Sequence, residues 1–188
     1  MSFLKSQGPI DSVKDILKLN TTAGIALIQY HSAVMRQPSE LSEKDRELIA
    51  AYVSGLNACQ YCYGVHSVTA ETYGIDESLL VELLNDIESA SLDTRMKPVL
   101  AYAKQLTQEP AKMTQTLVDN VLAAGWSDAA LHDIVNVVCL FNFMNRLVEG
   151  HGIEGSNDLF QVRGKALKES GYEPLLKVLE NGAEDSGS

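Results

Sequence analysis

Apolar residues recur with a helical period along almost the whole chain, and the alternation typical of half-buried strands is nearly absent. Proline and glycine residues punctuate this pattern and divide it into segments. The predicted helices cover residues 21–35, 42–55, 62–73, 76–83, 92–106, 114–124, 127–149 and 172–179. The sequence therefore predicts an all-α protein.

Capping residues support several of these boundaries. Ser42, followed by Asp45, is typical of a helix start, and Ser127 is a good N-cap for the long helix that follows it. Gly74 is a typical stop signal. Pro98 is expected in or near the first turns of its helix, where a missing N–H is tolerated.

The 188 residues contain no repeat of short fixed period and no low-complexity linker. This length suits one domain, so we predict a single helical domain over residues 1–188. Its core is expected over about 12–164 and a helical tail over 165–183. The charged and small residues 184–188 are expected to be disordered.

The predicted helix 127–149 is apolar nearly all round, and a helix of that kind is buried on every side. A small helical domain has little room for such an element. We therefore expect part of it to pack against another subunit of a homo-oligomer. The alternative is a central core helix of a monomer.

Composition and charge exclude several classes of function. Hydrophobic residues make up 45% and charged residues 21%, as in ordinary globular proteins. The formal net charge of −10 disfavours nucleic acid and anionic lipid as partners. No window approaches about 18 uninterrupted apolar residues, so no membrane span is predicted. The amino terminus lacks the features of a signal peptide, and we expect a cytoplasmic protein.

The segment Asn57–His66, NACQYCYGVH, carries the candidate chemistry. Cys59, Cys62 and His66 are spaced three and four residues apart, so on a helix they share one face. In a reducing compartment, such a close cysteine pair is more often catalytic or metal-binding than a permanent disulfide. The third cysteine, Cys139, lies in an apolar run and is expected in the core.

Glu47 is a further candidate, although it is distant in sequence. A turn near residues 55–57 would join two helices into a hairpin, with positions 47 and 66 equidistant from the turn. We therefore predict that Glu47 orients His66 and that His66 acts on Cys62.

This constellation suits thiol redox chemistry. A thiol reacts as its thiolate, and an imidazole held by a carboxylate can accept the proton. Attack on a peroxide leaves a sulfenic acid, which a neighbouring thiol converts to a disulfide, and a dithiol reductant then resets the pair. A helix N-terminus favours Cys59 as the attacking thiol and the His66 spacing favours Cys62, so the residues alone leave this choice open.

Metal and haem sites are the alternatives. Cys59, Cys62 and His66 offer three zinc ligands, but a closed site usually has four. His31, His132 and His151 are isolated in the sequence. Covalent haem attachment needs histidine directly after the second cysteine, where this chain has a tyrosine. We therefore predict no metal and no cofactor.

The stretch 41–66 resembles the AhpD-like alkylhydroperoxidase group of the carboxymuconolactone decarboxylase superfamily. Its signature is a glutamate, eleven residues, Cys-x-x-Cys, three residues and a histidine, which Glu47, Cys59, Cys62 and His66 match without a gap. The run 133–147 resembles the peroxidase-related branch of the same superfamily. The resemblance extends over about residues 12–152.

This resemblance implies an AhpD-like helical bundle assembled as a dimer, trimer or hexamer, and an antioxidant peroxidase that reduces organic hydroperoxides without metal or haem. It implies that Cys62 forms the sulfenic acid, that Cys59 closes the redox-active disulfide, and that Glu47 and His66 relay protons. A dithiol reductant protein is the implied partner.

Other functions stay open. The same dithiol could serve a thiol–disulfide oxidoreductase or a redox sensor that acts on a protein partner. A decarboxylase of the carboxymuconolactone type is weaker, because the dithiol is intact. Asn142, Asn145 and Arg146 could line a pocket, lie at a subunit contact, or satisfy buried polar groups.

Overall fold

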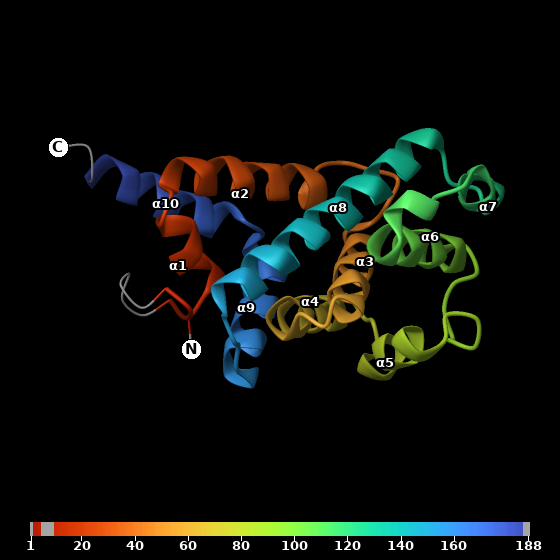
Figure 1. Ribbon diagram of the computed structural model, residues 1–188, viewed down its shortest axis with the longest axis horizontal. Coiled ribbons are helices and arrows are strands. Elements are labelled where there is room, and N and C mark those ends of the chain that lie inside the picture. Colours follow the sequence, from red (N-terminus) through yellow and green to blue (C-terminus); the bar gives the residue numbers. More distant parts are fainter. Residues whose placement is uncertain (1, 5–9, 186–188) are drawn as a thin grey trace.

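The computed structural model describes residues 2–4 and 10–185, and the regular elements within them are all helical (Figure 1). This confirms the predicted all-α fold. The helices are α1 (Val13–Lys18), α2 (Thr21–Arg36), α3 (Glu43–Leu56), α4 (Gln60–Thr72), α5 (Glu77–Asn85), α6 (Met96–Gln108), η2 (Pro110–Lys112), α7 (Gln115–Ala123), α8 (Asp128–His151), α9 (Asn157–Ser170) and α10 (Glu173–Asp185).

Most predicted boundaries lie within a few residues of the observed ones. The side chains of Ser42 and Asp45 form a capping box at the start of α3, and Ser127 caps α8. Two boundaries differ more: α10 ends six residues later than predicted, and α6 begins four residues later. Asp93 accepts the amide of Arg95 in a local turn, and helix then starts just before Pro98, which therefore lies in the first turn.

Two helices, α1 and α9, were not predicted. Helix α9 has a mostly polar sequence, and among its residues only Gly164 is buried. It nevertheless packs closely on α4, because a Cβ atom at position 164 would lie 2.6 Å from Cγ1 of Val68. The last helix, α10, continues to Asp185, into the segment expected to be disordered, and residues 186–188 lie outside the described residues.

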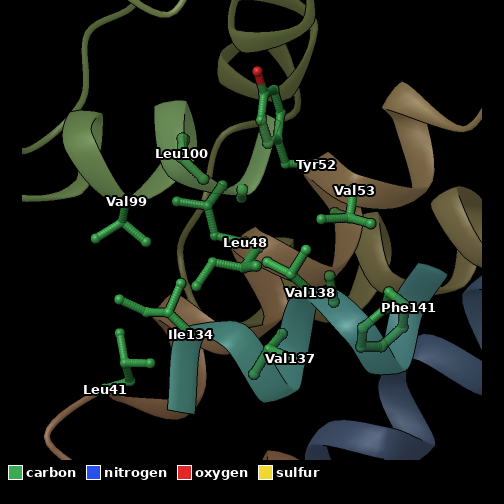
Figure 2. Packing of buried hydrophobic residues seen from close by; sticks show 14 of the residues in the cluster. Leu41, Leu48, Tyr52, Val53, Val99, Leu100, Ile134, Val137, Val138 and Phe141 are labelled. Atoms are coloured by element: carbon green, nitrogen blue, oxygen red, sulfur yellow. The ribbon is translucent and has the colours of Figure 1, made fainter. Parts of the chain in front are cut away.

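The core lies where α3, α6 and α8 meet. Figure 2 shows apolar side chains from these three helices converging, among them Leu48, Leu100 and Val138. Helix α8 crosses the middle of the molecule, while α10 runs beside α2 (Figure 1). One face of α8 stays uncovered in the single chain, and Phe143 is 51% exposed there. The expectation that Cys139 is a core residue is wrong, because it lies on the exposed part of α8.

Within residues 2–4 and 10–185, no helix combines the length and apolar character needed to cross a membrane.

Candidate active site

A tight turn between α3 and α4 places both cysteines of the motif. Ala58 adopts a left-handed backbone conformation (φ 53°), which is uncommon outside glycine. The amide of Cys59 then donates to the carbonyl of Ser54 at 3.0 Å, and Cys59 becomes the N-cap of α4. Cys62 follows in the first turn of that helix. Both are free thiols and both are buried, with Cys59 0% and Cys62 4% exposed.

The predicted contact between Glu47 and His66 is confirmed. His66 Nδ1 lies 2.7 Å from Glu47 Oε2. On the other side, Arg36 Nη2 donates to Glu47 Oε1 at 2.6 Å. Glu47 is fully buried, and burial alone would raise its pKa, but the charges and hydrogen bonds of His66 and Arg36 outweigh burial and lower it. Glu47 is therefore a carboxylate, and His66 Nδ1 is the donor.

Arg36 was not identified from the sequence. It stands eleven residues before Glu47 and belongs to a different helix, so no periodic pattern links the two. Its guanidinium also donates to the carbonyl of Leu167 at 3.2 Å, which ties α2 to α9 behind the buried carboxylate.

The two thiols are hydrogen-bonded to each other. This bond lowers the pKa of Cys59, which accepts it, and raises the pKa of Cys62, which donates it and is also deeply buried. A single negative charge in the pair therefore rests more readily on Cys59, at the helix N-terminus. The exposed carboxylate of Glu149 interacts with Cys59 from α8 and opposes this effect.

A network of amides joins α8 to the turn before Cys59. Asn57 Nδ2 donates to Asn145 Oδ1 at 2.9 Å and to Asn142 Oδ1 at 3.2 Å, while Asn145 Nδ2 donates to Ser54 Oγ at 3.0 Å. Arg146 Nη1 donates to Asn142 Oδ1 at 2.8 Å. Of the three expectations for these residues, satisfaction of polar groups is observed for Asn142 and Asn145, and a subunit contact stays a prediction.

Asn145 also contacts the candidate reacting sulfur. Its side chain hydrogen-bonds to Cys62 and lowers the pKa of that thiol, against the larger effects of Cys59 and of burial. Asn145 is 1% exposed, so water does not compete for this bond.

A cavity of about 140 Å³ adjoins the pair, and its walls are mainly apolar. Cys62 and His66 border it, whereas Cys59 is not among its lining residues. His31, on α2, and Tyr172, just before α10, also line the cavity. His31, which looks isolated in the sequence, thus lies at the site. Cys62 is the sulfur that a ligand in this cavity can reach.

The described residues contain no group of three or more histidine, cysteine, aspartate or glutamate side chains placed to hold a metal ion. The zinc arrangement considered from the sequence is therefore not formed there.

Comparison with known proteins agrees with this arrangement. The sequence model of the carboxymuconolactone decarboxylase family matches residues 23–105, a range that includes Glu47, Cys59, Cys62 and His66. No curated protein matched the chain.

Several solved structures share the fold. An uncharacterized peroxidase-related protein from Silicibacter sp. TM1040 is 25% identical, with a TM-score of 0.74 over 84% of this chain and 82% of that one. A peroxidase-related protein with an alkylhydroperoxidase AhpD core, from Ralstonia eutropha JMP134, is 20% identical, with a TM-score of 0.74 over 86% and 85%. The debrominase Bmp8, crystallised with 2,3,4-tribromopyrrole, is 13% identical, with a TM-score of 0.68 over 94% and 86%.

The helical architecture, the spacing of the four motif residues and these matches agree. Residues 23–105 thus match the carboxymuconolactone decarboxylase family, and the chain has the AhpD-like fold.

Proposed function

We propose that the protein is a cysteine-based peroxidase that reduces organic hydroperoxides. The observation that carries this proposal is the position of Cys62. Its sulfur borders an apolar cavity, is hydrogen-bonded to a second thiol, and shares the cavity with an imidazole held by a buried carboxylate. The mainly apolar cavity beside Cys62 suits a small organic substrate.

His66 takes one proton from the pair, and the single negative charge that remains is favoured on Cys59, whose pKa is lowered, while Cys62 keeps its proton. Transfer of that proton to Cys59 leaves the thiolate on Cys62. This thiolate attacks the hydroxyl oxygen of the hydroperoxide and the O–O bond breaks. The departing alkoxide takes a proton from His66 and leaves as the alcohol, and Cys62 becomes a sulfenic acid.

Cys59 then attacks the sulfur of the Cys62 sulfenic acid. The sulfenic hydroxyl leaves with the Cys59 proton as water, and the disulfide forms. In sum, two thiols are oxidised to one disulfide while one hydroperoxide is reduced to an alcohol and water. A dithiol reductant protein returns the pair to thiols by exchange.

The cavity has room for a small organic group. A dry apolar cavity of about 150 Å³ accommodates a benzene molecule, and this one measures about 140 Å³. We therefore propose a hydroperoxide whose apolar part is about the size of one aromatic ring, for which cumene hydroperoxide is a suitable probe.

Steady-state turnover tests the function. With dithiothreitol as reductant, the protein should consume cumene hydroperoxide, and Cys62→Ser should abolish this activity. Without dithiothreitol, Cys59→Ser should stop after one oxidation, with a dimedone-reactive sulfenic acid on Cys62. Cys139→Ser, which changes only the exposed cysteine on α8, is the matched control and should keep the wild-type rate. Wild-type turnover in the Cys62 variant would refute the proposal.

A further inference from the structure

One buried imidazole at the cavity takes no part in the steps above. His31, on α2, is 4% exposed and lines the same cavity as Cys62. Its Nδ1 lies 2.8 Å from the carbonyl oxygen of Leu27, so Nδ1 carries the hydrogen and donates it. Burial lowers the pKa of His31 to about 4, and the ring is neutral at neutral pH. Its Nε2 therefore has a lone pair available to accept a hydrogen bond.

A tyrosine with an unpartnered hydroxyl stands beside it. Tyr172, just before α10, is 6% exposed and also lines the cavity. Its ring centre lies 5.3 Å from that of His31. The Tyr172 hydroxyl is buried and has no hydrogen-bond partner among the described residues. Burial raises the pKa of Tyr172, so the group stays a phenol and can donate its proton. A buried donor of this kind is destabilising unless something pairs with it.

Two other uncharged hydroxyl groups that line the cavity already have partners. Ser12 Oγ donates to Asp15 at 2.7 Å, and the oxygen of Tyr61 accepts the amide of Val13 at 3.3 Å. His31 and Tyr172 thus place an acceptor and a buried, unpartnered donor beside each other on the wall of this mainly apolar cavity.

We propose that His31 and Tyr172 form the site that binds the oxygen end of the substrate. His31 Nε2 accepts the O–H of the hydroperoxide, and the Tyr172 hydroxyl donates to the oxygen attached to carbon. That oxygen carries the negative charge as the O–O bond breaks, so a preorganised donor there lowers the barrier. The identification of the ligand as a hydroperoxide rests on the proposed function, but the same pair would bind the product alcohol.

Single-turnover kinetics test this pair. The rate of Cys62 oxidation by cumene hydroperoxide should fall by about 10–100-fold in Tyr172→Phe and in His31→Leu, since the loss of one such donor costs on the order of 10²-fold or more in favourable cases. Alkylation of Cys62 by iodoacetamide, which needs neither group, should keep its rate. Because the hydroxyl has no partner, Tyr172→Phe should not lower the melting temperature.

A matched control is available in the core. Tyr52, on α3, also has a buried hydroxyl without a partner among the described residues, but it does not line the cavity. Tyr52→Phe should leave the peroxide rate unchanged. A Tyr172→Phe protein that reacts with cumene hydroperoxide as fast as the Tyr52→Phe protein would overturn the proposal.

Binding of the product separates this pair from the proposed function. In a Cys62→Ser background, 2-phenyl-2-propanol should bind at least several-fold more weakly after Tyr172→Phe, as followed by titration in NMR spectra. If wild-type protein reduces no hydroperoxide but this difference is seen, the peroxidase proposal fails and the oxygen-binding pair stands. Equal affinities in the two proteins would refute the proposed His31–Tyr172 binding site, whatever the peroxide assays show.

Discussion

Glu47 shows how a single buried residue organises the site. One carboxylate oxygen accepts from His66 and the other from Arg36, so a charge that would be costly in isolation is compensated on both sides. Counting outward from the turn near residue 56 predicted the first of these contacts correctly. The second could not be predicted, because Arg36 belongs to another helix.

Replacement of Glu47 by glutamine should slow oxidation of Cys62 by about 10²–10⁴-fold, the usual range for general acid–base catalysis. A neutral amide no longer supports the protonated form of His66, which gives its proton to the alkoxide. Stopped-flow measurement with cumene hydroperoxide checks this. The control is Glu43→Gln, one turn earlier and partly exposed, which also lies near Arg36. Equal rates in the two variants would contradict the role of Glu47.

Asn145 offers a separate test of how Cys62 is activated. Asn145→Ala removes the donor that lowers the Cys62 pKa, so the alkylation profile of Cys62 should move to higher pH. It also removes the donor to Ser54 Oγ and one of the two acceptors of Asn57 Nδ2, at a cost of about 1–3 kcal/mol. Asn142→Ala, in the same network but without a recorded contact to the sulfur, should leave the profile in place. A shift of the same size in both variants would argue against a direct contact.

His31 makes stability depend on pH in a defined direction. Its folded pKa of about 4 lies below its unperturbed value of 6.5, so between these values the unfolded chain binds a proton that the folded chain does not. Stability should therefore fall as pH falls through this window, by about 2 kcal/mol between pH 7 and pH 5. His31→Leu should remove most of that loss in urea unfolding, whereas His132→Gln, on the exposed surface, should retain it.

At the level of elements, the sequence predicts strongly periodic helices well and polar ones badly. The segments that became α2, α3 and α8 carry clear apolar stripes or caps, and their boundaries were close to those observed. Helix α9 has neither a wide apolar stripe nor many fully buried residues. It meets α4 through a close approach at Gly164 and through partly buried apolar side chains such as Phe160. The packing of α9 on α4 depends on tertiary structure, which the periodicity of the sequence does not predict.

Two glycine substitutions measure that approach. An alanine Cβ at position 164 would lie 2.6 Å from Val68 Cγ1 and 2.9 Å from the carbonyl of Val65, so Gly164→Ala should cost about 1–3 kcal/mol in urea unfolding. At Gly150 on α8, a Cβ meets nothing within 4 Å, and Gly150→Ala should be neutral or stabilise by up to about 1 kcal/mol. A stabilised Gly164→Ala protein would show that α9 does not pack tightly on α4.

At the scale of the whole molecule, the cavity brings together residues far apart in sequence. Cys62 and His66 come from α4, His31 from α2 and Tyr172 from the approach to α10. Cys62 and His66 belong to a motif that can be recognised in the sequence. No local pattern in the sequence identifies His31 and Tyr172, because their proximity depends on how α10 packs beside α2.

Self-association through α8 stays a prediction. The uncovered face of α8 presents Phe143, which is 51% exposed. If this face joins subunits, Phe143→Glu should lower the molar mass measured by light scattering. Val81→Glu, at a 53% exposed position on α5, is the control and should leave the mass unchanged. A wild-type protein that is monomeric at all concentrations would contradict the expectation.

The central claim is that the thiols of Cys59 and Cys62 are oxidised to a disulfide when a hydroperoxide enters the adjoining cavity. Intact-mass analysis after one equivalent of cumene hydroperoxide tests it most directly. We expect the protein to lose the mass of two hydrogen atoms and its two buried thiols to become unreactive towards alkylation, with the dithiol state restored by dithiothreitol. An unchanged mass, with both thiols still free after the oxidant is added, would contradict the account.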